Sequence, residues 1–277
     1  MFRDVAFGQY YPADSFVHKM DPRVKIILSL CYLVGIIFIN SFFGFAIITV
    51  ALILAFIFSK VPVKSVFRSI KPIIFLIVFT TIINLLFVND GRVIAEWWII
   101  KITEGGLIFS GRMVLRLLYL VLGASFLTLT TTPVDLSSAI GSLLSPLYIF
   151  RIPVHIFSLI MSITLCFIPS LMEEADRIIR AQKARCANFE SGNIFKRAKA
   201  FIPILIPLLI GAFRRAEDLA LAMESRCFGA VKRPTKMKKM KVGLRDLFGA
   251  IFFLAIFAVM LYVRYTTSLS AFPWMYI

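Results

Sequence analysis

Long apolar stretches recur along this chain, and they constrain its fold more than any other feature of the sequence. They run approximately over residues 24–40, 45–59, 73–88, 106–129 and 247–263. Each is long enough, or nearly so, to cross the roughly 30 Å hydrocarbon core of a bilayer as a helix rising about 1.5 Å per residue. We therefore predict an all-α integral membrane protein with about five transmembrane helices.

The composition of the chain and of these stretches narrows the function. Hydrophobic residues make up 60% of the chain and 28 residues are Phe, well outside the averages for soluble domains. None of the five stretches contains Asp or Glu, although ion-coupled carriers usually need a titratable group where the substrate crosses. No P-loop, HExxH or GxSxG motif is present. We therefore expect a protein that is not itself an enzyme.

The distribution of charge predicts how the chain is oriented. The formal net charge is +16, and residues 171–245 hold 17 Lys and Arg against 7 Asp and Glu. The loop 60–71 holds four basic residues and no acidic one. Basic regions of membrane proteins remain in the cytoplasm, so both regions and the N-terminus are predicted to be cytoplasmic, and the turn at 89–91 external. A basic cytoplasmic face also explains the charge without nucleic-acid binding.

One short pattern occurs twice in the basic region. The first copy, residues 181–186, reads Ala-Gln-Lys-Ala-Arg-Cys, and the second, residues 222–227, reads Ala-Met-Glu-Ser-Arg-Cys. The two arginines, Arg185 and Arg226, lie 41 positions apart, and each ends an apolar helical stripe. A duplicated arginine at a helix end suggests a partner with two similar sockets. The alternative is that each arginine merely complements the dipole of its helix.

The region that carries this pattern is predicted to contain two or three long amphipathic helices. One begins at Pro133, where proline is tolerated in the first turn, and others begin near residues 154 and 195. We expect them to lie at the cytoplasmic surface, although residues 154–170 could also span the bilayer. The predicted organisation is a membrane part over residues 1–130, a coupling region over 131–242, and a last span and tail over 243–277.

Two arginines interrupt the fourth stretch, and four cysteines are scattered along the chain. Arg112 and Arg116 share one helix face, and they either extend to the lipid head groups or bind backbone carbonyls or a nearby carboxylate such as Glu104. The cysteines have no paired spacing and no companion metal ligands, so packing is their predicted role. We expect no bound metal or cofactor.

Taken together, these motifs resemble those of the transmembrane coupling (T) subunits of energy-coupling factor transporters. The resemblance rests on the two arginine patterns, on Thr131-Thr132-Pro133, and on an N-terminal segment that contains Gly8-Gln9-Tyr10, Asp14-Ser15, His18 and Asp21-Pro22-Arg23. It covers nearly the whole chain. In this family the pattern usually reads Ala-Arg-Gly, whereas here Cys186 and Cys227 replace the glycine and Ser225 replaces the first alanine. That departure puts a need for glycine backbone geometry in doubt.

The resemblance implies a non-catalytic subunit of an ATP-driven importer in the cell membrane. Its partners would be two ATP-binding-cassette ATPases, which bind the ATP, and a separate membrane subunit that captures a vitamin or other micronutrient. The implied ATPase-docking residues are Ala184, Arg185, Cys186, Ser225, Arg226 and Cys227. The implied substrate-subunit face comprises Leu136, Leu143, Leu144, Ile206, Leu209 and Phe213. A self-contained membrane carrier and a membrane assembly scaffold with a basic cytoplasmic domain are the alternatives.

Overall fold

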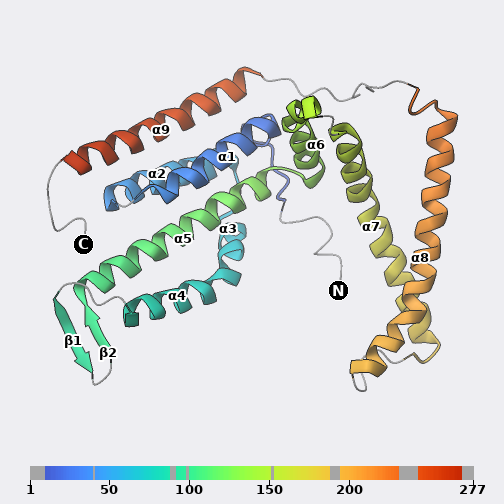
Figure 1. The fold of residues 1–277 in the computed structure, drawn as a ribbon, viewed down its shortest axis with the longest axis horizontal. Coiled ribbons are helices and arrows are strands. Elements are labelled where there is room, and N and C mark those ends of the chain that lie inside the picture. The colour runs from blue at the N-terminus through green and yellow to red at the C-terminus, as the bar shows by residue number, and fades with distance from the viewer. Residues whose placement is uncertain are drawn as a thin grey trace. The chain divides into compact units, whose positions relative to one another are not determined.

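The computed structural model confirms a helical membrane protein (Figure 1). It describes residues 10–39, 41–87, 92–97, 100–150, 153–187, 194–230 and 243–269. The chain divides into two compact units, one comprising residues 1–8 and 140–239 and the other residues 9–139 and 240–277. The described elements are α1 (Pro22–Ile37), α2 (Phe42–Ser59), α3 (Val63–Ile70), η1 (Lys71–Ile73), α4 (Ile74–Phe87), β1 (Val93–Trp97), β2 (Ile100–Thr103), α5 (Glu104–Thr130), α6 (Pro133–Leu143), η2 (Ser145–Phe150), α7 (Val154–Ala184), α8 (Ile194–Ser225) and α9 (Leu244–Leu269).

Four helical segments in the described part of the chain are long and apolar enough to cross a membrane. They are α2, α5, α7 and the continuous segment Val63–Phe87, which comprises α3, η1 and α4. Helix α1, which contains most of the first predicted span, has 16 residues, which rise about 24 Å. Helix α9, which contains the last predicted span, has 26 residues. Helix α7 is thus long and apolar enough to span the bilayer, and its location at the cytoplasmic surface stays a prediction.

A hairpin of two short strands, β1 and β2, precedes α5, and the sequence analysis did not predict it. The strands are antiparallel, with Glu96 opposite Lys101 and Trp97 opposite Ile100. Thr103 then caps the N-terminus of α5 by accepting a hydrogen bond from the Gly106 N–H at 3.2 Å. The turn expected at residues 89–91 lies outside the described residues.

Helices α1, α2 and α5 pack around an aromatic centre. Phe45 of α2 stacks on Tyr119 of α5 with ring centroids 5.9 Å apart, and both side chains are buried. The Tyr119 hydroxyl lies 2.6 Å from Thr49 Oγ1. Tyr32 of α1 donates its hydroxyl proton to the Tyr119 carbonyl at 3.0 Å, which joins α1 to α5. Each buried hydroxyl of this centre therefore has a partner, as burial requires.

The start of α1 is tied to the start of α9 by one buried carboxylate. Asp246 Oδ1 accepts from the Asp21 N–H at 2.6 Å, and Asp246 Oδ2 accepts from the Gly243 N–H at 2.7 Å. Asp21 itself caps α1 by accepting from the Arg23 N–H at 3.0 Å. Acidic side chains thus accept from N–H groups of Asp21 and Arg23 at the start of α1 and of Gly243 at the start of α9, where the positive end of each dipole favours negative charge.

His18 organises the segment before α1. Its Nδ1 lies 2.7 Å from Ser15 Oγ, and its Nε2 lies 3.0 Å from the Tyr11 carbonyl oxygen. Burial lowers the pKa of His18, because the partly buried ring disfavours the charged form. In the neutral ring Nε2–H donates to the carbonyl and Nδ1 accepts from Ser15. Of the N-terminal motif residues, Gly8 and Gln9 lie outside the described residues.

Candidate functional site

Both arginines of the duplicated pattern stand at the C-terminal ends of the two longest described helices. Helix α7 has 31 residues and ends at Ala184, and α8 has 32 residues and ends at Ser225. Arg185 is the C-cap of α7, and its N–H donates to the Gln182 carbonyl at 3.1 Å. The Arg226 N–H donates to the Met223 carbonyl at 3.2 Å. The prediction that each arginine ends a helix is confirmed.

The two helix ends have the same hydrogen-bonded cap. After α7, the Cys186 N–H donates to the Lys183 carbonyl at 3.0 Å and the Ala187 N–H donates to the Gln182 carbonyl at 3.0 Å. After α8, the Cys227 N–H donates to the Glu224 carbonyl at 2.9 Å and the Phe228 N–H to the Met223 carbonyl at 2.9 Å. In each pair, one N–H donates to the carbonyl three residues earlier and the next N–H donates to the carbonyl five residues earlier. This pair of bonds defines the Schellman motif.

Each cap places a cysteine in the left-handed backbone region. Cys186 has φ of 63° and Cys227 has φ of 57°, and Lys60 is the only other non-glycine residue at positive φ in the described part of the chain. Glycine normally occupies this position, because a Cβ disfavours the left-handed conformation. The doubt raised by the missing glycine is resolved, since the backbone geometry is present with cysteine in glycine's place.

The predicted docking residues are all exposed. Ala184, Arg185 and Cys186 are exposed at the end of α7, and Ser225, Arg226 and Cys227 at the end of α8. The Ser225 hydroxyl donates to the Ala222 carbonyl at 3.0 Å, so it continues the hydrogen bonding of the last turn. Within the described residues neither arginine forms an ion pair. Their guanidinium groups can therefore bind an external partner without first breaking an internal ion pair.

Helices α7 and α8 pack against each other in opposite directions, which separates the two arginines (Figure 1). The contact includes an ion pair between Glu174 of α7 and Arg215 of α8. Gly211 lies beside it, where a Cβ would come within 2.9 Å of Glu174 Oε1. Arg185 and Arg226 each stand eleven residues, about 16 Å of helix, beyond a member of this pair. The arginines therefore occupy opposite ends of the helix pair, and the sequence analysis did not identify the ion pair between them.

The residues predicted to contact a substrate-binding subunit fall into two groups. Ile206, Leu209 and Phe213 share one face of α8, and more than half of each side chain is exposed. Leu136, Leu143 and Leu144 belong to α6 and the residue after it, and they are half-buried. Ile202, Leu205 and Ile210 are also exposed apolar residues of α8, and the sequence analysis did not single them out.

Arg116, inside α5, binds a backbone carbonyl of another helix end. Its Nη2 donates to the Ile39 carbonyl at 2.8 Å, just beyond the end of α1. The carbonyls at a helix end lack partners within their own helix, so a cation is favourable there. Binding to a backbone carbonyl, which was one of the alternatives considered for this residue, is the arrangement observed.

The long apolar helices define a multi-pass membrane protein. Residues 13–238 match the family described as CbiQ, cobalt transport protein. An energy-coupling factor transporter transmembrane protein of Ruminiclostridium cellulolyticum is 46% identical over 241 residues, which cover 87% of this chain and 90% of that protein. The proteins of the same name from Clostridium kluyveri and Staphylococcus aureus are 40% and 37% identical, covering 95% and 96% of this chain and 98% and 99% of their own lengths.

The chain belongs to this family, and it is a transmembrane component of an energy-coupling factor transporter. The predicted resemblance is therefore confirmed over most of the chain. Such a component works in a complex with other subunits.

Proposed function

We propose that this protein is the coupling subunit of an ATP-driven importer, and that each of its two arginine-bearing helix ends docks into a different ATP-binding-cassette ATPase. The observation that carries the proposal is the pair of identical caps, which present Arg185 and Arg226 in the same local geometry at opposite ends of α7 and α8. Two equal sites on one chain suit two similar partners. The partner ATPases bind and hydrolyse the ATP, and this subunit is not catalytic.

The chemistry of arginine suits such a docking site. Its guanidinium is planar, always charged and offers five N–H donors, so it binds carboxylates and carbonyl oxygens in a groove. Removing one partner of a buried charged pair typically costs about 2–5 kcal/mol, which corresponds to roughly 30-fold to several-thousand-fold in affinity. The exposed positions of Arg185 and Arg226 leave both groups available for this contact.

The exposed stripe of α8 supplies the second part of the proposal. Ile206, Leu209 and Phe213 present apolar surface on the same helix whose end carries Arg226. An amphipathic helix that lays its apolar face against a partner is a common mode of recognition. We assign this stripe, with Leu136, Leu143 and Leu144 of the α6 region, to a separate membrane subunit that captures a vitamin or other micronutrient. Movement of α7 and α8 by the ATPases then reaches that subunit through α8, which carries both Arg226 at its end and the apolar stripe.

This arrangement requires the helix ends to face the cytoplasm, where ATP is available. The excess of basic residues around α7 and α8 supports that orientation, and it also supports a cytoplasmic N-terminus in the cell membrane.

The test is to change both docking arginines and purify the complex from its native membrane. Arg185→Ala or Arg226→Ala alone is expected to lower transport and leave partial assembly, because the remaining contact still tethers the complex. The double variant is expected to reach the membrane and lose both ATPases on purification. Arg180→Ala with Arg214→Ala is the matched control, since these arginines are also exposed and lie on the same two helices.

Co-purification of the double variant with both ATPases at normal yield, together with normal transport, would show that the arginines serve only their own helix ends. Loss of the ATPases from the control variant as well would show that any reduction of positive charge weakens assembly, and the specific role of the two caps would then be wrong.

A further inference from the structure

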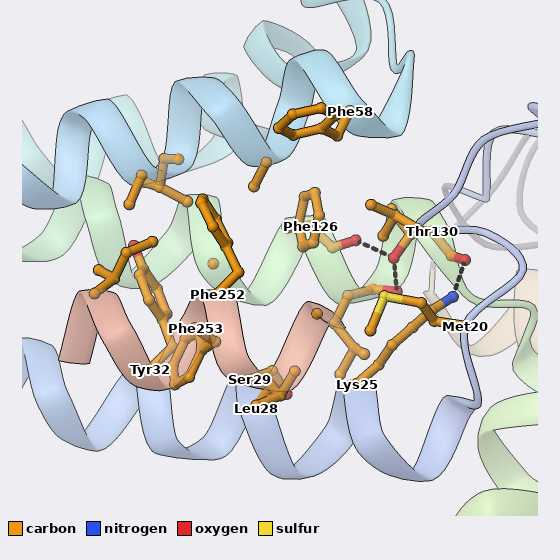
Figure 2. Close-up of a pocket in the computed structure, with 18 of the residues that line it drawn as sticks. Met20, Lys25, Leu28, Ser29, Tyr32, Phe58, Phe126, Thr130, Phe252 and Phe253 are labelled. Atoms are coloured by element: carbon orange, nitrogen blue, oxygen red, sulfur yellow. Dashed lines mark hydrogen bonds between the residues drawn. The ribbon is translucent and has the colours of Figure 1, made fainter. Parts of the chain in front are cut away.

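An apolar cavity of about 620 Å³ lies between α1, α2, α5 and α9 in the unit that comprises residues 9–139 and 240–277. Figure 2 shows it from inside, with Phe252 and Phe253 of α9 and Phe126 of α5 directed into it. Met20 and Lys25 lie at one end, beside Thr130. Cavities of roughly 300–1,000 Å³ accommodate whole small molecules. None of the residues proposed for docking or coupling lines this space.

Among the described residues that line the cavity, no polar side chain is left without a partner for an occupant to bind. The four polar side chains of the lining each donate to a backbone carbonyl: Ser29 to Ile26 at 2.9 Å, Tyr32 to Tyr119 at 3.0 Å, Thr130 to Phe126 at 2.8 Å, and Lys25 to Thr130 at 3.0 Å. Water enters a cavity only where several polar partners receive it. The occupant is therefore apolar.

The cavity also continues onto the outer surface of the helices. Phe58 of α2 and Phe248 of α9 line it, and they are 57% and 64% exposed. Two of the lining helices, α2 and α5, are long and apolar enough to span the bilayer. The hydrocarbon chains of the membrane are therefore the apolar material that surrounds the opening.

The charges around Lys25, at one end of the cavity, determine which part of a lipid can enter. The Lys25 ammonium lies near the carboxylates of Asp21, Asp135 and Asp246, and it already donates to two carbonyls, those of Thr130 and His18. The charge of the Lys25 ammonium is thus already compensated by three carboxylates, so little positive charge is left to attract a further anion. A phosphate or carboxylate head group is therefore disfavoured inside, and a neutral hydrocarbon chain is favoured.

We propose that this cavity binds one acyl chain of a bilayer phospholipid, inserted from the side between α2 and α9, with its head group remaining outside. The acyl chain fills a space that would otherwise leave the side chains around it without contacts. It thereby joins α9 to the bundle of α1, α2 and α5. The site is independent of the arginine-bearing helix ends.

The experiment uses the full chain in vesicles that contain phosphatidylglycerol and a phosphatidylcholine whose acyl chain carries a photoactivatable diazirine. After irradiation, mass spectrometry of peptides locates the label. We expect label on cavity-lining positions such as Leu28 and Phe253 in excess of that on Val50 and Ile53, which are exposed on the outer face of α2. Equal labelling of the lining and the exposed positions would overturn the proposal.

Two lining alanines allow the cavity to be filled from one helix. Ala51 and Ala55 lie one turn apart on α2 and line the cavity. Ala51→Phe with Ala55→Phe is expected to abolish the excess label and to reduce the rise in melting temperature that added phospholipid gives the detergent-purified wild type. Ala46→Phe is the matched control, because Ala46 is exposed on the same helix and does not line the cavity. Unchanged labelling in the filled variant would overturn the proposal, and if that variant does not fold, the wild-type label pattern decides.

A free fatty acid with the same diazirine distinguishes the source of the chain. We expect the phospholipid probe to label the cavity, and we expect the diazirine fatty acid not to label it. As a competitor, an excess of fatty acid without the diazirine is expected to leave the phospholipid label unchanged. Labelling by the fatty acid alone would overturn the assignment to a phospholipid.

Discussion

Cysteine stands at two positions where the backbone is left-handed and the family usually has glycine, and both positions directly follow an arginine that is proposed to dock. The left-handed conformation costs a residue with a Cβ roughly 1–2 kcal/mol. Two Schellman hydrogen bonds offset this cost at each end, those of Cys186 and Ala187 after α7 and those of Cys227 and Phe228 after α8. The cap that orients each arginine is therefore stable enough to form with cysteine, and it is weaker than a glycine cap.

Substituting these cysteines should change the stability of the caps in opposite directions. Cys186→Gly is expected to slow hydrogen exchange of the Ala187 amide, which donates to Gln182 and exchanges when the cap opens. Cys186→Val is expected to speed it, because a β-branched residue is least tolerated at positive φ. A difference of 1–2 kcal/mol corresponds to about 5- to 30-fold in the exchange rate.

The measurement is amide exchange by mass spectrometry, corrected for intrinsic rates, with Cys227 variants and the Phe228 amide as the second copy. Equal rates in the glycine and valine variants would show that the left-handed residue does not limit the cap.

Contacts between helices depend on small residues at a few crossing points. Gly123 of α5 lies directly against the ring of Tyr32 of α1, and the ring is fixed by its hydrogen bond to the Tyr119 carbonyl. A Cβ at Gly111, three turns earlier on α5, would meet nothing within 4 Å in the described part of the chain apart from its own helix backbone. The same residue type therefore serves close packing at one position and has open space at the other.

Alanine substitution should separate these two glycines. Gly123→Ala is expected to destabilise the protein by about 1–3 kcal/mol, because an added methyl group overpacks a fixed ring. Gly111→Ala is expected to stabilise it by about 0.5–1 kcal/mol, since alanine favours the helix. Denaturation by sodium dodecyl sulfate in mixed micelles measures both changes in the free energy of unfolding. Similar effects at the two positions would contradict the contact seen between α1 and α5.

At the scale of the molecule, charge and apolar length together predict the topology. The segment Val63–Phe87 begins with the basic residues Lys64, Arg68 and Lys71 and continues as an apolar helix. The positive-inside rule places its start in the cytoplasm and its end outside. The same rule predicts that the ends of α7 and α8 are cytoplasmic, on the side where ATPases would find ATP.

Labelling of single cysteines tests this topology. In a variant whose four native cysteines are replaced, a cysteine at position 64 or 183 is expected to be protected from a membrane-impermeant maleimide in intact cells. A cysteine at Arg92, which is exposed and precedes β1, is expected to react. Detergent permeabilisation should expose all three sites and serves as the control. Reaction at position 183 in intact cells would overturn the cytoplasmic placement of α7.

The sequence by itself determined the class of the protein and the position of both helix ends. A stretch of apolar residues forms a helix in lipid wherever it occurs, because its backbone must satisfy its own hydrogen bonds. The caps at Arg185 and Arg226 depend on bonds that reach only three to five residues back, so a local pattern indicates them.

Only the tertiary structure decided which distant groups meet. The Glu174–Arg215 ion pair joins residues 41 positions apart, and Arg116 reaches the carbonyl of Ile39 across 77 positions. The apolar cavity exists because α1, α2, α5 and α9 leave space between them. Helical periodicity shows which face of a helix is apolar, but it does not show which helix that face meets or how closely they pack.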